Sequence, residues 1–306
     1  MDESALQRAL ATRINLQIVI SSIPSISEEM DLPLSRWLDS VPLPPELPEG
    51  EGTNLAVLLS SDLTRMAWSA YGPPAAFIPK MAQYFQKSGM TEADLDLINA
   101  MGDAMAPNQV GSWIRAGAAG VVTGWQFREP MPVEVIAPFL GEGFLVTKLM
   151  SWTVKRDIVN YTSFRRSVGE GARSQLELVL PEGTAAEKLA MVAAGFVDLA
   201  ELELPASALE VLARDGDDIS LALEFEGDRV TAASVFAPGP ALDEVSEMCS
   251  RMGVAYSDKI GQLARMLGAD GTRRIEVRVS GDGGPPEADV ELVPGELQGP
   301  PAPPSN

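Results

Sequence analysis

A strand–strand–helix–helix order occurs twice in this chain, and it restricts the fold more than any other feature. From Ile219 to Leu267, two alternating apolar–polar runs joined by Gly227 and Asp228 predict a β-hairpin, and two helical patterns follow it. The segment from Asn54 to Gly102 has the same order of elements. A supersecondary unit that recurs along a chain predicts a domain that is built from repeats.

The same periodicities extend along the chain and predict five hairpins separated by helix pairs. The predicted hairpins pair 54–59 with 65–71, 110–116 with 121–127, 158–164 with 175–180, 219–225 with 230–236, and 274–279 with 289–293. The predicted helices cover 2–20, 27–38, 76–87, 92–105, 133–140, 144–152, 185–199, 206–213, 242–252 and 258–267. Thr91 is the expected N-cap of the fourth helix, with Asp94 as its partner.

We predict one repeat-built domain over residues 1–294 and a disordered, proline-rich tail over 295–306. Residues 41–52 are rich in proline and glycine and are expected to form a connector. Two α+β domains that divide near Gly141 to Trp152 are an alternative that the pattern leaves open.

Composition excludes several classes of function. The chain has 306 residues, no histidine and one cysteine, so catalytic triads with histidine, histidine-bound metals and internal disulfides are absent. The formal net charge of −20 is opposite to the basic footprint that nucleic-acid binding requires. No signal peptide or membrane-spanning run is apparent, and we expect a cytoplasmic protein without a membrane partner. We predict no resident metal.

The alternation within the strands indicates which faces are buried. In 219–225 the large apolar residues are Ile219, Leu221, Leu223 and Phe225, whereas Glu224 lies on the opposite face. Similar alternation places Glu177, Glu276 and Arg278 on polar faces of other strands. Helices cover apolar surface, so the polar faces lie on the other side of the sheet. An open antiparallel sheet and a closed barrel with a polar lumen both satisfy this, and we favour the barrel because closure removes exposed edges.

This order of elements resembles the PT barrel, the ABBA fold of the aromatic prenyltransferases. The resemblance covers nearly the whole chain and is architectural, since no family motif accompanies it. It implies an α+β fold in which a ten-stranded antiparallel β-barrel is surrounded by helices. It also implies a lumen in which inward Lys and Arg side chains hold an allylic diphosphate, beside a region that holds an aromatic acceptor.

Transferred to this sequence, the resemblance implies a set of candidate site residues. The candidate diphosphate ligands are Arg65, Arg115, Arg165, Arg274 and Arg278. Glu224 or Glu177 would act as a base or accept a hydrogen bond from the acceptor, and Trp113 and Tyr71 would line the site. The sequence departs from the family in having no lysine at a strand centre.

Each of these assignments has a structural alternative. Arg274 and Arg278, with Glu276, could form an ion network with Asp289 and Glu291 across the strands. Trp113 and Trp125 could be packing residues, and Trp68 is expected in the core because it shares a face with Met66 and Ala70.

The predicted function is transfer of an isoprenoid from an allylic diphosphate to an aromatic or peptide acceptor. Whether the chain is an enzyme is left open by the sequence. The alternative is a non-catalytic barrel or open sheet that binds a cationic or hydrophobic small molecule, or a protein partner. No cofactor is expected, although Mg²⁺ accompanying the diphosphate is left open.

Overall fold

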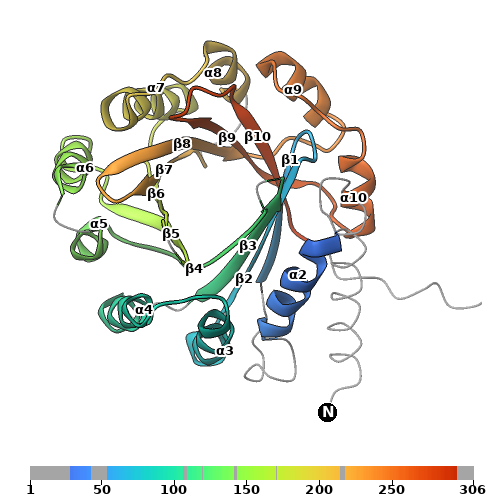
Figure 1. Ribbon diagram of the computed structural model, residues 1–306. Coiled ribbons are helices and arrows are strands. Elements are labelled where there is room, and N and C mark those ends of the chain that lie inside the picture. The colour runs from blue at the N-terminus through green and yellow to red at the C-terminus, as the bar shows by residue number, and fades with distance from the viewer. Residues whose placement is uncertain are drawn as a thin grey trace, which may run out of the picture.

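Ten antiparallel strands close into a barrel in the computed structural model, and helices surround it (Figure 1). The structure describes residues 28–42, 54–105, 109–118, 120–140, 143–169, 171–213 and 218–294. The predicted helix at 2–20, most of the 41–52 connector and the 295–306 tail therefore lie outside the described residues. The strands are β1 (Asn54–Ser60), β2 (Arg65–Gly72), β3 (Val110–Gly117), β4 (Gly120–Pro132), β5 (Asn160–Ser167), β6 (Ser174–Val179), β7 (Ser220–Glu226), β8 (Arg229–Pro238), β9 (Thr272–Ser280) and β10 (Glu287–Leu292).

Every strand pairs with its neighbours in sequence, and β1 pairs with β10 to complete the ring. The predicted barrel is thus confirmed, and the open-sheet alternative is wrong. Because consecutive strands are antiparallel, the five hairpin turns lie at one end of the barrel and the helical connections leave from the other. We call these the hairpin end and the helix end.

The described helices precede the first hairpin and follow each of the first four, in the predicted order. They are α2 (Glu28–Ser40), α3 (Pro74–Lys87), α4 (Glu92–Met105), α5 (Val133–Ile136), α6 (Phe144–Val154), α7 (Ala185–Gly195), α8 (Ala206–Leu212), α9 (Val245–Met252) and α10 (Ile260–Met266). Two of the helix predictions need correction. The 133–140 segment is a short helix followed by a 3₁₀ turn, Ala137–Phe139, and the 185–199 segment ends in a π-helical turn, Phe196–Ala200. The capping box of α4 is confirmed, because Thr91 and Asp94 each donate a backbone N–H to the side chain of the other.

The hydrophobic core lies between the barrel and the helices, as the alternation predicts. Trp68, Trp125 and Phe164 are almost fully buried on outward strand faces, and Trp125 packs against Phe127 and Phe164 with ring centroids 5.3 and 5.5 Å apart. The assignment of Trp68 to the core is confirmed, and Trp125 is a packing residue. Helix α2 docks on β3, where the indole N–H of Trp37 donates to Ser112 at 3.0 Å.

The turn of the fourth hairpin makes a contact that the sequence did not predict. Asp228 reaches α6 and accepts hydrogen bonds from the backbone N–H groups of Phe144 (3.1 Å) and Leu145 (2.6 Å). These are unpaired donors at a helix N-terminus, where a carboxylate also faces the positive end of the helix dipole. A Cβ at position 143 would lie too close to the Oδ1 of Asp228, so a larger residue there would displace this carboxylate.

Candidate site in the barrel lumen

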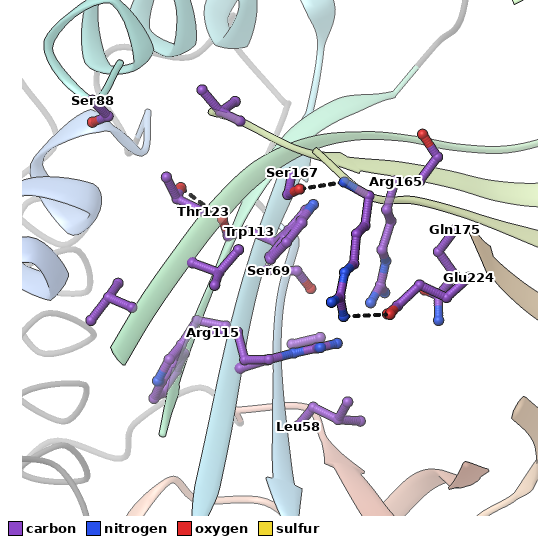
Figure 2. A pocket seen from close by; sticks show the side chains of 18 of the residues that line it. Leu58, Ser69, Ser88, Trp113, Arg115, Thr123, Arg165, Ser167, Gln175 and Glu224 are labelled. Atoms are coloured by element: carbon purple, nitrogen blue, oxygen red, sulfur yellow. Dashed lines mark hydrogen bonds and ion pairs between the residues drawn. The ribbon is translucent and has the colours of Figure 1, made fainter. Parts of the chain in front are cut away.

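A cavity of about 490 Å³ occupies the lumen toward the hairpin end. Its walls include Leu58, Trp113, Arg115, Arg165, Arg173 and Glu224, which come from β1, β3, β5, the β5–β6 turn and β7. The side chains of Arg115, Arg165 and Glu224 point toward one another across the pocket (Figure 2). The polar faces of strands far apart in sequence therefore meet around one cavity, and its volume is in the range of small-molecule sites.

All five predicted arginines face the lumen, but three of them are engaged in ion pairs. Arg65 pairs with Glu287 at 2.8 Å and with Asp289 at 2.6 Å. Arg278 pairs with Glu224 at 3.0 Å and with Glu287 at 3.5 Å. Arg274 pairs with Glu177 and also donates to Ser220 at 2.9 Å.

The ion network differs from the predicted alternative in its partners. Arg274 and Arg278 were expected to pair with Asp289 and Glu291 on the neighbouring strand. Instead, Arg274 on β9 reaches Glu177 on β6, and Arg278 reaches Glu224 on β7. Lumen-facing side chains of a closed barrel can meet across its interior, which pairing of neighbouring strands does not anticipate.

The pair of Glu177 with Arg274 is strongly stabilised in its charged form. Burial pushes the pKa of the Glu177 carboxyl upward, but the charge and hydrogen bonds of Arg274 and the hydroxyl of Ser220 outweigh it and lower the pKa to about 2. Glu177 is 6% exposed and does not line the cavity. Glu177, one of the two candidate bases, thus lies in an ion pair beside the cavity.

A second polar cluster lies toward the helix end and includes a residue that the sequence analysis missed. Strand β4 was expected to stop at Phe127 but runs to Pro132, which places Arg128 in the lumen. Arg128 pairs with Glu291 at 3.5 Å and lies over the ring of Tyr71, 4.8 Å from its centroid. The predicted ligand-binding Tyr71 therefore faces the lumen but contacts Arg128 and is not part of the cavity wall.

Arg115 and Arg165 differ from the other lumen arginines because no described carboxylate lies within ion-pair distance of either. Their cross-strand neighbours are uncharged. Arg115 lies opposite Ala67 and Val122, and Arg165 lies opposite Gln126 and Gln175. Burial lowers the pKa of the Arg165 guanidinium and the like charge of Arg128 adds to this effect, whereas the charges of Glu177, Glu291 and Glu276 partly oppose it. Each keeps a positive charge at neutral pH, since arginine is not deprotonated in proteins.

Unsatisfied polar atoms accompany Arg165. Within the described structure, the Nε of Arg165 and both amide atoms of the fully buried Gln126 have no hydrogen-bond partner. Buried polar groups are nearly always hydrogen-bonded, and leaving one unpaired is costly. This part of the lumen is therefore suited to water or to a polar ligand.

Trp113 forms an aromatic wall beside these arginines. Its indole N–H donates to the carbonyl oxygen of Trp125 at 3.1 Å, and the guanidinium of Arg115 lies 6.0 Å from its ring centroid. A side chain at Gly124 would collide with the Trp113 ring, so this glycine makes room for the indole. Of the two tryptophans for which alternatives were open, Trp113 lines the cavity and Trp125 belongs to the outer core.

Glu224 presents one free carboxylate oxygen at the cavity. Its Oε1 accepts from Arg278 at 3.0 Å, Thr231 at 3.2 Å and Arg173 at 3.4 Å, whereas no described residue donates to Oε2. Burial acts to raise the pKa of Glu224, but the charges of Arg278, Arg115 and Arg173 outweigh it, and the pKa is lowered. This carboxylate is ionised at neutral pH and can accept a hydrogen bond from a ligand.

The pKa of Glu276 is shifted in the opposite direction. It faces Asp289 directly across the β9–β10 ladder, and both carboxyls are buried. Burial raises the pKa of Glu276, and the charge of Asp289 raises it further, although Ser234 donates a hydrogen bond at 2.7 Å. The lumen thus contains carboxyls whose pKa values are shifted in opposite directions by their surroundings.

Among the described residues, no group of three or more Cys, Asp or Glu side chains is placed to hold a metal ion. None of the helices in the described ranges is long and apolar enough to cross a membrane.

Comparison with known sequences gives one informative relative. No family model matches the chain. A PH domain-containing protein of Dictyostelium discoideum is 26% identical over 267 residues, an alignment that covers 84% of this chain. The chain spans 58% of the length of that relative.

Solved structures share the architecture at low sequence identity. The 5-dimethylallyl tryptophan synthase of Streptomyces coelicolor, in complex with DMASPP and Trp, matches with a TM-score of 0.65 and 12% identity over 96% of this chain and 97% of that one. PriB, in a ternary complex with L-tryptophan and dimethylallyl thiolodiphosphate, matches with a TM-score of 0.64 and 10% identity over 94% and 96% of the two chains. AnaPT from Neosartorya fischeri matches with a TM-score of 0.57 and 10% identity over 92% and 93%. The chain therefore has the PT-barrel, or ABBA, fold of the aromatic prenyltransferases.

Proposed function

We propose that the barrel binds an allylic diphosphate in its lumen and transfers the isoprenoid to an aromatic or peptide acceptor. The observation that carries this proposal is the presence of two cations, Arg115 and Arg165, that face a cavity of about 490 Å³ without a carboxylate partner among the described residues. Solved barrels of the same fold contain DMASPP or a thiolodiphosphate together with tryptophan or brevianamide F, which supports the choice of ligand class.

Each residue around the cavity has a separate role in the proposed reaction. Arg115 and Arg165 hold the diphosphate through charge-assisted hydrogen bonds, for which the planar guanidinium is well suited. The bond between the allylic carbon and the diphosphate oxygen breaks, and the electron pair leaves with the diphosphate. The acceptor ring supplies the electron pair of the new bond and then releases a proton to water. The face of Trp113 stabilises the allylic cation while it forms.

Glu224 orients the acceptor in this scheme. Its free Oε2 accepts a hydrogen bond from an acceptor N–H, and its lowered pKa keeps it ionised for that purpose. Arg65, Arg274 and Arg278 shape the lumen through their ion pairs, and Glu177 serves as the partner of Arg274. The proposal thus narrows the predicted set of ligand arginines from five to two.

Calorimetric titration of the whole chain with inorganic pyrophosphate and with dimethylallyl thiolodiphosphate tests the anion site. We expect binding by the wild type and a loss of about ten-fold or more in affinity for Arg115→Gln and Arg165→Gln, because each removes one charge-assisted contact. Arg251→Gln on the exposed surface of α9 changes the net charge equally and is the matched control. Absence of binding by the wild type at millimolar ligand would overturn the proposal.

A non-catalytic binding protein is the second candidate. It is favoured by the ion pairs that occupy Arg65, Arg274 and Arg278, and by the lack of lysine in the lumen-facing strands. Incubation with prenyl diphosphates and a panel of aromatic and peptide acceptors, followed by mass spectrometry, separates the two candidates. A product heavier by one isoprenoid supports transfer, whereas the absence of any product together with binding of a cationic or hydrophobic small molecule, or of a protein partner, supports the binding protein.

A further inference from the structure

Arg173 stands at the mouth of the cavity with a fixed backbone and an exposed side chain. It precedes β6 at the end of the β5–β6 turn and lines the cavity. Its backbone N–H donates to the Ser167 hydroxyl at 2.8 Å, and its carbonyl accepts from the Ser167 N–H at 2.8 Å. The side chain itself is 52% exposed. The chain thus anchors the Cα atom firmly and leaves the guanidinium able to change its position.

The contacts that now hold the guanidinium are long. Arg173 lies 3.4 Å from Oε1 of Glu224 and 3.5 Å from Oε2 of Glu226. That oxygen of Glu224 already accepts from Arg278 at 3.0 Å and from Thr231 at 3.2 Å. Glu226 is 47% exposed, so water screens its pair with Arg173. Arg173 is therefore a weakly held cation in contact with the cavity.

We infer that Arg173 is a third cation of the anion site, and that it exchanges Glu224 and Glu226 for a phosphate-bearing ligand when one enters. This inference rests on the proposed anion site at Arg115 and Arg165. Before binding, the two carboxylates compete with the ligand for Arg173. Glu226 is then an affinity-lowering residue, since its removal leaves Arg173 with only the crowded oxygen of Glu224. Glu224 keeps its contacts with Arg278 and Thr231 after the exchange.

This competition predicts that substitutions of Arg173 and of its ion-pair partner Glu226 have opposite effects on the affinity for the ligand. In titrations of the whole chain with inorganic pyrophosphate at fixed ionic strength, Arg173→Gln should weaken binding about five-fold, the factor for roughly 1 kcal/mol at an exposed charge. Glu226→Gln should tighten binding by about two- to five-fold. The double variant should bind like Arg173→Gln, because Glu226 acts through Arg173.

Glu210→Gln on α8 is the control for net charge, since Glu210 is exposed and lies outside the lumen. Tighter binding by Glu226→Gln than by Glu210→Gln, lost in the double variant, supports the exchange. Equal affinities for Glu226→Gln and Glu210→Gln, or an unchanged affinity for Arg173→Gln, overturn it while Arg115→Gln and Arg165→Gln still report on the proposed function. A wild type that binds no pyrophosphate overturns both. Thermal melts verify that each variant is folded.

Discussion

Two parts of the lumen contain arginine side chains in different electrostatic surroundings. Strands β9 and β10, which we call the acid-rich wall, place Arg274 and Arg278 among lumen-facing Glu and Asp residues. Strands β3 and β5, which we call the acid-free strands, contain Arg115 and Arg165 and no Asp or Glu at all. The arginines of the acid-rich wall are paired, and those that face the cavity from the acid-free strands are not. An inward arginine is thus a stronger ligand candidate when no carboxylate, from any strand of the barrel, lies within ion-pair distance of it.

The paired and unpaired arginines should also differ in whether they affect the stability of the fold or the binding of a ligand. Buried charges that are paired contribute little net stability, but removing one partner is costly because the other charge stays buried. Arginines beside the cavity that form no ion pair remain available to a ligand. Substitutions that break an ion pair of the acid-rich wall should therefore lower the free energy of unfolding. Substitutions of Arg115 or Arg165 on the acid-free strands should instead lower the affinity for a ligand.

The largest expected effect is at the buried ion pair that joins Arg274 of the acid-rich wall to Glu177 on β6. Glu177→Gln leaves Arg274, which is 11% exposed, without its carboxylate partner. We expect the free energy of unfolding to fall by about 3–5 kcal/mol, measured by urea denaturation at pH 7. Glu210→Gln on the surface should change it by less than about 0.5 kcal/mol. Equal stabilities of these two variants would contradict the comparison.

The pH dependence of the same variant gives an independent check. The pKa of Glu177 is lowered to about 2 in the folded chain, against 4.5 ordinarily. A lowered folded-state pKa contributes stability above the unfolded value that is lost as pH falls toward the folded value. The stability difference between wild type and Glu177→Gln should therefore be constant above pH 5 and shrink between pH 4.5 and 2. A difference that is unaffected by pH in this interval would show that the carboxylate is not responsible.

A smaller effect of opposite sign is expected at Glu276. Burial raises the pKa of this carboxyl, so its folded state is favoured below pH 4.5 and loses stability as pH rises through the raised value. Glu276→Gln resembles the protonated form and does not titrate. We expect it to be more stable than the wild type by about 1 kcal/mol at pH 8, with the gain vanishing toward pH 4 in thermal melts.

Asp289→Asn is the matched contrast for Glu276→Gln. The two carboxyls are direct cross-strand partners, but Asp289 pairs with Arg65 at 2.6 Å. The asparagine variant should therefore lose stability at pH 8, where the glutamine variant gains it. The same sign for both variants would indicate that burial alone, and not the ion pair, decides their contributions.

The sequence predicted the barrel because the alternation of strands and the spacing of apolar residues in helices each involve only residues that are close in sequence. Alternation within β7 separates Leu221 and Leu223 from Glu224, and the same pattern assigns every predicted arginine to the lumen. It could not predict the partners of those arginines. Arg274 lies 97 residues from Glu177, and Arg65 lies 224 residues from Asp289, so only closure of the barrel brings them together.

Two lumen residues were missed for different reasons. Arg128 continues the inward series of Gly124 and Gln126, and extending the alternation of β4 by one residue would have identified it. Arg173 follows two glycines in the β5–β6 turn, where no periodicity indicates the direction of a side chain. A lack of acidic residues in 110–117 and 160–167 was visible in the sequence, but 65–72 lacks them too and Arg65 is nevertheless paired, so this signal alone does not identify the unpaired arginines.

The smallest expected change in stability is at Arg115. Its guanidinium has no ion pair with a described carboxylate and faces the cavity, so Arg115→Gln breaks no ion pair, and Glu224 keeps its contacts with Arg278 and Arg173. We expect the free energy of unfolding to change by less than about 0.5 kcal/mol, although the same variant should lose affinity for pyrophosphate. Urea denaturation in the absence of ligand measures the first quantity, and adding pyrophosphate should stabilise the wild type more than the variant. A loss of several kcal/mol without ligand would place Arg115 with the arginines of the acid-rich wall and remove the physical basis for treating the acid-free strands as a binding surface.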